Sequence, residues 1–169
     1  AKELQMALAS VAEQTYSDIE VIVVDDGSKS NFQIFKFSNF QTRCPDIPVR
    51  LVRQKHAGAP AARNRGLQEA KGEYVIFWDA DVIGDPDMLE KMYLALQKHP
   101  EASYAYSDFR YGWKKMRGRP FAAAALKQNN YIHTTSLVRR ADLQAEPWDE
   151  SLKRFQDWDL WLTFLENNK

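Results

Sequence analysis

The fold of this chain is decided by residues 20–28, which read EVIVVDDGS. The first part of the stretch is a continuous apolar run rich in β-branched residues, which is typical of a strand buried on both faces. The run stops at residues 25–28, where two aspartates, a glycine and a serine favour a loop. The stretch therefore predicts a buried strand that ends in a pair of carboxylates.

Apolar runs and helical periodicities alternate on both sides of this strand. Further strands are predicted over residues 49–52, 74–78 and 102–106. Helices are predicted over the first residues, between residues 32 and 43, over 61–70, after Pro86 and along the apolar stripe of 158–165. Residues 108–120 are predicted to be irregular, and residues 129–136 are polar. Strands that alternate with helices predict an α/β fold, with a mostly parallel sheet flanked by helices.

Length and composition restrict the class of protein. The 169 residues suffice for one domain, and 44% hydrophobic with 27% charged residues is the balance of a globular chain. With 23 basic and 23 acidic residues the net charge is zero, which argues against a general nucleic-acid binder. Cys44 is the only cysteine, so an internal disulfide is excluded and a reducing compartment is favoured. With no export signal in the sequence, we expect a cytoplasmic protein.

Two predicted strands end in acidic residues, the first in Asp25 and Asp26 and another in Asp79 and Asp81. In an open α/β sheet, ligands bind beyond the carboxyl ends of the strands. In extended backbone Asp79 and Asp81 would point the same way, about 7 Å apart. Their repulsion of roughly 2 kcal/mol would be relieved by a divalent cation, Mg²⁺ or Mn²⁺. The alternative is that these aspartates only end strands and begin turns.

Asp157 lies where the last predicted helix begins. It is either the N-cap of that helix or a general base whose pKa is raised by apolar surroundings from Trp158 and Trp161. Asp159 does not face Asp157 on a helix, so the two do not form a pair. His133 is the histidine whose position favours the wall of a crevice.

A basic run interleaved with aromatic residues covers the segment from Arg110 to Arg119. Its basic members are Arg110, Lys114, Lys115, Arg117 and Arg119, and its aromatic members are Tyr111 and Trp113. Such a run indicates either a solvated loop or contact with an anionic acceptor or a membrane surface.

Four separated segments, in order and together covering nearly the whole chain, resemble family-2 glycosyltransferases of the GT-A type. They are Ser10–Ser28, Gly58 with Ala62–Leu67, Ala70–Asp81, and Trp148–Leu152 with Gln156–Leu162. The resemblance implies a mixed, mostly parallel sheet of Rossmann-like, nucleotide-binding architecture. Residues 1–107 would bind a donor and residues 108–169 would face an acceptor, within one catalytic domain of residues 1–169.

The resemblance also implies roles for single residues. The residues that it assigns to a nucleotide-sugar donor are Asp25, Asp26, Arg63, Asn64 and Asp79. Asp26 would meet the nucleobase, usually uridine. Asp79 and Asp81 would form a D-x-D motif that holds Mn²⁺ or Mg²⁺ against the donor diphosphate. Asp157 would be the catalytic base.

The implied reaction is inverting, metal-dependent transfer of a sugar from a nucleotide-diphosphate donor to an acceptor hydroxyl. The acceptor would be a saccharide, a lipid-linked molecule or another hydroxyl compound of cell-envelope polysaccharide biosynthesis, and not a nucleic acid. Peripheral membrane contact through Arg110–Arg119 would place the protein at the inner face of the membrane.

The chain departs from the family pattern at both ends. Family members begin with an apolar strand before the first helix, whereas here the helix comes first, and only 12 residues follow Asp157. We therefore expect either a fragment or a sheet rebuilt in another way. Two alternatives stay open: a haloacid-dehalogenase-like phosphatase that uses Asp79 and Asp81, and a non-catalytic nucleotide-binding remnant.

Overall fold

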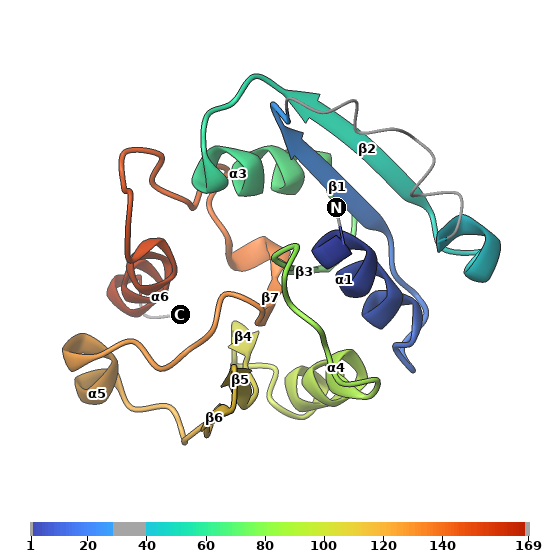
Figure 1. The fold of residues 1–169 in the computed structure, drawn as a ribbon. Helices are drawn as coiled ribbons and strands as arrows, with labels where there is room; N and C mark the ends of the chain where they lie inside the picture. The colour runs from blue at the N-terminus through green and yellow to red at the C-terminus, as the bar shows by residue number, and fades with distance from the viewer. Residues whose placement is uncertain (1, 29–39, 168–169) are drawn as a thin grey trace.

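The computed structural model describes residues 2–28 and 40–167, with helices and strands arranged as in Figure 1. The helices are α1 (Lys2–Ala12), α3 (Ala59–Glu69), α4 (Met88–Lys98), α5 (Ala123–Gln128), a 3₁₀ turn at Arg140–Asp142, and α6 (Gln156–Glu166). The strands are β1 (Val21–Asp26), β2 (Val49–Gln54), β3 (Tyr74–Ile76), β4 (Tyr104–Ala105), β5 (Phe109–Tyr111), β6 (Lys114–Met116) and β7 (Leu137–Arg139). None of the described helices is long and apolar enough to span a membrane.

The predicted order of strands and helices is confirmed up to β4. The helix predicted between residues 32 and 43 lies largely outside the described residues, and its last part, residues 40–43, is helical. The prediction that residues 108–120 are irregular is wrong, because β5 and β6 form an antiparallel hairpin there. Strand β7 and helix α5 were not predicted.

The strands form a mixed set of sheets. Strand β1 pairs with β2 in parallel, from Val21 opposite Val49 to Asp26 opposite Gln54. Strand β7 lies between β3 and β4 and is antiparallel to both. The predicted α/β class with a mixed sheet and flanking helices is therefore confirmed, and β7 accounts for its antiparallel part.

A mainly apolar cavity of about 1150 Å³ separates β1 from β3. Both strands line it along their lengths, and α1 and α3 contribute their inward side chains. Its apolar lining includes Leu8, Val11, Val23, Leu67, Val75 and Phe77. No strand joins β1 to β3 in the part of the chain that the structure describes, so the sheet is not rebuilt there and helices must hold its two parts together.

The main core lies between α6, α5 and the three-stranded sheet. Trp148, Trp161 and Val138 are fully buried in it. The ring of Phe77, at the end of β3, meets that of Trp148 edge to face, with centroids 5.0 Å apart. Burial of two whole tryptophans stabilises this half of the molecule by several kcal/mol, at roughly 2–3 kcal/mol for each large apolar side chain.

Helix α1 is joined to the start of α4 through one buried side chain, that of Gln14. Its amide nitrogen donates to the carbonyl of Asp85 at 2.8 Å, and its amide oxygen accepts from the backbone N–H of Leu89 at 3.0 Å. Leu89 is the second residue of α4, where backbone N–H groups have no partner within the helix. Because the α4 N-cap makes no side-chain cap hydrogen bond, Gln14 replaces it from the segment just after α1.

Replacement of Gln14 by alanine is expected to lower the free energy of unfolding by about 2 kcal/mol, because the buried N–H of Leu89 loses its partner and the carbonyl of Asp85 keeps only the N–H of Met88. Chemical denaturation followed by circular dichroism measures this. Gln5→Ala is the matched control, since Gln5 is an exposed glutamine on the neighbouring helix α1. Equal stability of the two variants would contradict the role given to Gln14.

Candidate functional site

Three carboxylates, two from the turn after β3 and one from α6, are close enough to the imidazole of His133 to act on its charge. Burial lowers the pKa of His133 below its usual value. The negative charges that act in the opposite direction are those of Asp79, Asp81 and Asp157. The structure therefore brings the predicted D-x-D pair, the predicted base and the predicted crevice histidine into one cluster, which we call the carboxylate cluster.

The backbone of the D-x-D segment is turned, not extended. The N–H of Val82 donates to the carbonyl of Asp79 at 3.0 Å, which closes a four-residue turn after β3. The expected spacing of two carboxylates along an extended strand is therefore wrong. Asp81 is exposed at the surface of this turn, whereas the Asp79 side chain is only 36% exposed.

The guanidinium of Arg63, on α3, joins three parts of the cluster. It donates to Asp79 Oδ1 at 2.8 Å and to Gln156 Oε1 at 3.1 Å. Its Cζ also lies 4.5 Å from the ring centroid of Trp148. Arg63 is 16% exposed, and its planar donors fix the end of β3 relative to the first residue of α6.

Asp157 lies in the first turn of α6 but does not cap the helix. The N-cap is Phe155, which has a left-handed backbone with φ of 59° and makes no side-chain cap hydrogen bond. Asp157 Oδ2 accepts from the side-chain amide of Asn130 at 2.7 Å, and Oδ1 accepts from the N–H of Trp158 at 3.0 Å. The capping alternative is therefore wrong, and both carboxylate oxygens of Asp157 accept hydrogen bonds from other donors.

The two tryptophans of α6 anchor the helix that carries Asp157. The indole N–H of Trp158 donates to the carbonyl of Leu126 at 2.7 Å, and that of Trp161 to the carbonyl of Ile132 at 3.1 Å. Trp161 is fully buried in the core. Trp161 therefore holds α6 in place and does not form the apolar surroundings of the Asp157 carboxylate that the sequence suggested.

Asn130 and Gln156 are site residues that sequence reasoning missed. The Asn130 side-chain oxygen accepts from the N–H of Ile132 at 3.1 Å, which leaves its NH₂ group directed at Asp157. Residues 129–136 were noted only as polar, and that polarity was the available signal. The N–H of Thr135 donates to His133 Nδ1 at 3.1 Å, so in the neutral ring the proton lies on Nε2.

Asp25 and Asp26 lie at the carboxyl end of β1, where the sequence placed them. Asp26 is tied to the loop after β2, because Gln54 Nε2 and the backbone N–H groups of Ala57 and Gly58 each donate to its carboxylate at 2.8 Å. Burial alone would raise the pKa of Asp26, but these hydrogen bonds hold it below its usual value.

The same turn brings two backbone segments into close contact. Gly27 has a φ of 75°, and a Cβ atom there would lie 2.7 Å from the backbone nitrogen of His56. His56 Nδ1 lies 2.8 Å from the Asp26 carboxylate, with its side chain 78% exposed. His56 is therefore the partner of Asp26 that an incoming ligand would displace most easily.

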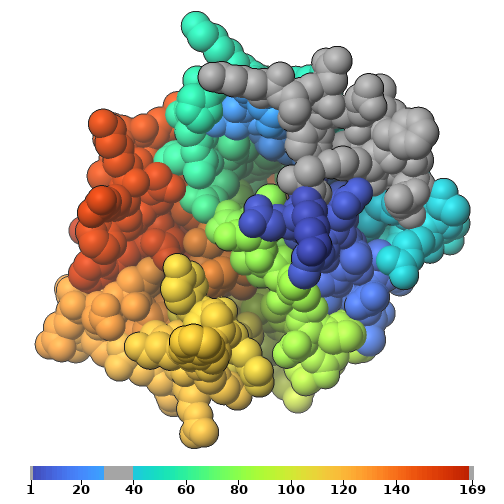
Figure 2. Space-filling view, in the orientation of Figure 1, coloured from blue at the N-terminus to red at the C-terminus, as the bar shows by residue number. Residues whose placement is uncertain are grey.

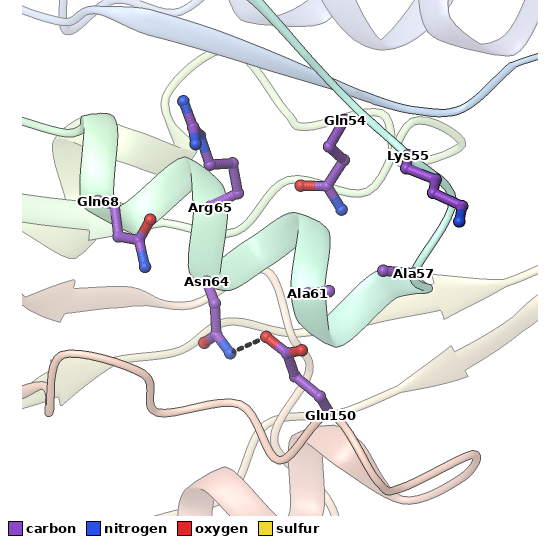
Figure 3. Close-up of a pocket in the computed structure, with 8 residues that line it drawn as sticks. All are labelled: Gln54, Lys55, Ala57, Ala61, Asn64, Arg65, Gln68 and Glu150. Carbon is purple, nitrogen blue, oxygen red and sulfur yellow. Dashed lines mark hydrogen bonds between the residues drawn. The ribbon is translucent and has the colours of Figure 1, made fainter.

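Asn64 points away from the carboxylate cluster, toward the loop before α6. Its amide donates to the carbonyl of Trp148 at 2.9 Å and to Glu150 at 3.1 Å, and accepts from the N–H of Trp148 at 3.0 Å. Figure 3 shows the Asn64–Glu150 bond at the edge of a pocket of about 270 Å³ between α3 and that loop. Asn64 is buried, and both its amide oxygen and its amide nitrogen are hydrogen-bonded. In this structure its side chain therefore holds the loop before α6 against α3.

Comparison with known proteins identifies the family. The sequence model described as "Glycosyl transferase family 2" matches residues 1–148. An uncharacterized glycosyltransferase of Methanocaldococcus jannaschii is 24% identical over 183 residues, which cover 99% of this chain and 61% of that protein. The protein named UDP-Glc:alpha-D-GlcNAc-diphosphoundecaprenol beta-1,3-glucosyltransferase WfgD, of Escherichia coli, is 27% identical over 98% of this chain and 65% of its own length.

Among solved structures, residues 1–349 of S. aureus TarS share the fold with a TM-score of 0.72 and 22% identity. The match covers 95% of this chain and 52% of that one. The same TarS fragment has been crystallised with UDP and with UDP-GlcNAc. The chain thus spans less than two thirds of the length of each of these three proteins.

The lowered pKa of Asp26 predicts acid sensitivity. Its carboxylate binds a proton less readily in the folded state, so the unfolded state binds more protons and stability rises with pH. The contribution is complete above the unfolded pKa, near 3.8, and is lost as pH falls through the lower folded value. Denaturation titrations at pH values from about 6 to about 3 measure the slope of the free energy of unfolding against pH.

The free energy of unfolding should depend less steeply on pH in Asp26→Asn than in the original chain. Asp46→Asn, which removes one exposed carboxylate, is the matched control and should keep the original slope. Identical slopes for Asp26→Asn and the original chain would show that these loop hydrogen bonds do not stabilise the ionised carboxylate.

Proposed function

Because this chain belongs to glycosyl transferase family 2, we propose that it transfers a sugar from a nucleotide-diphosphate donor to an acceptor hydroxyl, with inversion at the anomeric carbon. The observation that carries the proposal is the carboxylate cluster, in which Asp79, Asp81 and Asp157 all act on the charge of His133, and Asp79 is bonded to the guanidinium of Arg63. The carboxylates of Asp79 and Asp81 suit the binding of a cation together with a diphosphate. The carboxylate of Asp157 suits proton transfer. Family membership decides against the phosphatase alternative.

The donor is proposed to be UDP-linked. UDP and UDP-GlcNAc bind to TarS, and the printed name of WfgD specifies UDP-Glc. Asp25 and Asp26 are assigned to the nucleobase end, where the exposed His56 can give way to a ligand. Arg63 and Asp79 are assigned to the diphosphate end, and Asn64 supports Arg63 by fixing the loop at Trp148.

A Mg²⁺ or Mn²⁺ ion fits the residues at this end. Asp79 Oδ1 is bonded to Arg63, whereas Oδ2 has no hydrogen-bond partner among residues 2–28 and 40–167, and Asp81 lies exposed two residues away. Within the same part of the chain no group of three or more acidic, histidine or cysteine side chains forms a complete metal site. Two carboxylates that share the ion with substrate phosphates are the usual arrangement for Mg²⁺. When bound, the ion would offset negative charge on the departing diphosphate.

Asp157 is the proposed base. Its carboxylate takes the proton of the acceptor hydroxyl while the hydroxyl oxygen attacks the anomeric carbon, and the bond from that carbon to the diphosphate oxygen breaks. Attack from the face opposite the diphosphate inverts the configuration. Asn130 holds Oδ2 of the base, and Arg63 binds both the donor side and α6, so donor and base keep one relative orientation.

The acceptor is proposed to be a lipid-linked or other envelope glycan. The name of WfgD specifies a diphosphoundecaprenol-linked sugar as its acceptor. Residues 108–169, which supply Asn130, His133 and Asp157, form the acceptor side, and residues 1–107 form the donor side. The remaining alternative, a nucleotide-binding remnant without catalysis, differs by predicting UDP binding without sugar transfer.

Metal-dependent UDP binding is the first prediction of this proposal. Calorimetric titration of UDP into the chain with Mn²⁺ should show binding that chelator weakens by about 10-fold or more, since the ion would offset the repulsion between the carboxylates and the diphosphate. Asp81→Ala should lose most of the affinity measured with Mn²⁺ and little of that measured with chelator. An equal loss under both conditions would refute its role as a metal ligand.

Loss of the base should abolish transfer but not donor binding. Asp157→Asn is expected to lower kcat by about 10²–10⁴-fold, with the UDP affinity nearly unchanged, because the amide cannot accept the proton. Sugar release and transfer from UDP-sugars measure this. Asp159→Asn, in the same turn of α6, is the control and should retain activity. Full transfer activity in Asp157→Asn would refute the assignment.

A further inference from the structure

The hairpin of β5 and β6 presents a fully exposed tryptophan at its tip. Tyr111 and Lys114 are the last paired residues, and Gly112 and Trp113 form the turn between them. Gly112 alone of the two has a positive φ, 59°, which is the pattern of a type II′ turn with glycine first. Trp113 is 100% exposed and Tyr111 is 84% exposed, so neither ring packs on the described part of the protein.

The same hairpin carries a concentration of positive charge, although the net charge of the whole chain is zero. Residues 108–119 contain five basic side chains and one acidic one, which gives a net charge of +4 where the whole chain has zero. Lys115 pairs with Asp108 at 2.9 Å, and the guanidinium of Arg119 lies 3.9 Å from the ring centroid of Tyr131. Arg110 and Lys114 form no ion pair with any residue that the structure describes, and both are exposed.

The base of the hairpin adjoins the carboxylate cluster. The ring of Phe109, in β5, lies against the imidazole of His133 with centroids 4.7 Å apart. After β6 the chain returns to the body of the protein, where the hydroxyl of Tyr106 donates to the carbonyl of Arg119 at 2.7 Å. In Figure 2 the golden atoms below the centre belong to this part of the chain and project from the surface.

We propose that this hairpin docks the protein on an anionic membrane surface, with the Trp113 indole in the headgroup region and Arg110 and Lys114 on acidic lipids. Tryptophan and tyrosine prefer the membrane–water interface, and lysine and arginine near the surface gain from the negative potential of acidic lipids. Charge alone would suit a soluble polyanion equally well. The exposed indole favours the membrane, because its apolar area is stabilised only by leaving water.

Docking through the hairpin also orients the site. Since Phe109 contacts His133, the carboxylate cluster lies beside the docked surface, where the hydroxyl of a lipid-linked acceptor would be found. This orientation rests on the proposed function, whereas membrane binding itself does not. The test therefore measures binding to vesicles without donor or acceptor, so that its failure is distinct from failure of sugar transfer.

Vesicle flotation tests the docking. The chain should bind vesicles of phosphatidylcholine with about 30 mol% phosphatidylglycerol at least about 10-fold more tightly than pure phosphatidylcholine, and about 0.5 M salt should weaken the binding. Trp113→Ala and the double variant Arg110→Glu/Lys114→Glu should each lose most of it. Equal binding by these variants and the original chain would overturn the proposal.

Matched controls separate the hairpin from general charge and hydrophobicity. Lys2→Glu/Lys98→Glu makes the same change in net charge at exposed sites on α1 and α4, and Leu94→Ala removes an exposed apolar side chain from α4. Both should bind the acidic vesicles like the original chain. Losses equal to those of the hairpin variants would overturn the proposal, as would binding to heparin but not to vesicles, which indicates a soluble polyanion.

Tryptophan fluorescence measures independently whether the Trp113 indole enters the lipid bilayer. Brominated lipids in the acidic vesicles should quench part of the fluorescence of the bound chain. Trp113→Phe should bind nearly as well but lose most of that quenching, because Trp148 and Trp161 are buried and Trp78 and Trp158 are only partly exposed. Quenching of Trp113→Phe as strong as that of the original chain would place another surface against the membrane and overturn the proposal.

Discussion

The structure depends on one turn of α3, because β1 and β3 do not pair with each other in the described part of the chain. Arg63 and Asn64 are consecutive on this helix and therefore point about 100° apart. Asn64 fixes the loop at Trp148 through two hydrogen bonds to the same residue, and Arg63 fixes Asp79 at the end of β3. The helix that packs on β1 thus also sets the position of the second sheet.

This arrangement makes the site sensitive to packing far from it. Arg63 meets Asp79 on one side and Gln156 on the other, while its plane lies over Trp148. Trp148 is held in turn by Asn64 and by the edge of the Phe77 ring. The position of Asp79 relative to the start of α6 therefore depends on Arg63 and the buried aromatic pair beneath it, and not on the sheet itself, which Figure 1 shows divided between β1 and β3.

The sequence predicted the elements whose patterns are local. β1 follows from its apolar run and α6 from its apolar stripe. β7 was missed because Leu137–Arg139 is a three-residue strand whose position depends on pairing with β3 and β4, whose last residues, Ile76 and Ala105, lie 61 and 32 positions before Leu137. The turn at Asp79 was one of two alternatives that the sequence left open, and the hydrogen bond from the N–H of Val82 to the carbonyl of Asp79 decides between them. Asn130 has no motif, and only its contact with Asp157 reveals it.

Charge balance connects the cluster to its proposed ligands. Three carboxylates act on His133, which burial favours as the neutral imidazole, and Arg63 supplies one positive charge. A diphosphate added to this cluster would increase an existing negative excess in a partly desolvated site, where like charges repel more strongly than in water. A divalent cation entering with the donor would remove most of that excess. The proposed role of Asp157 as a base would then be compatible with an anionic donor bound beside it, because Asp79 and Asp81 would share their charge with the cation.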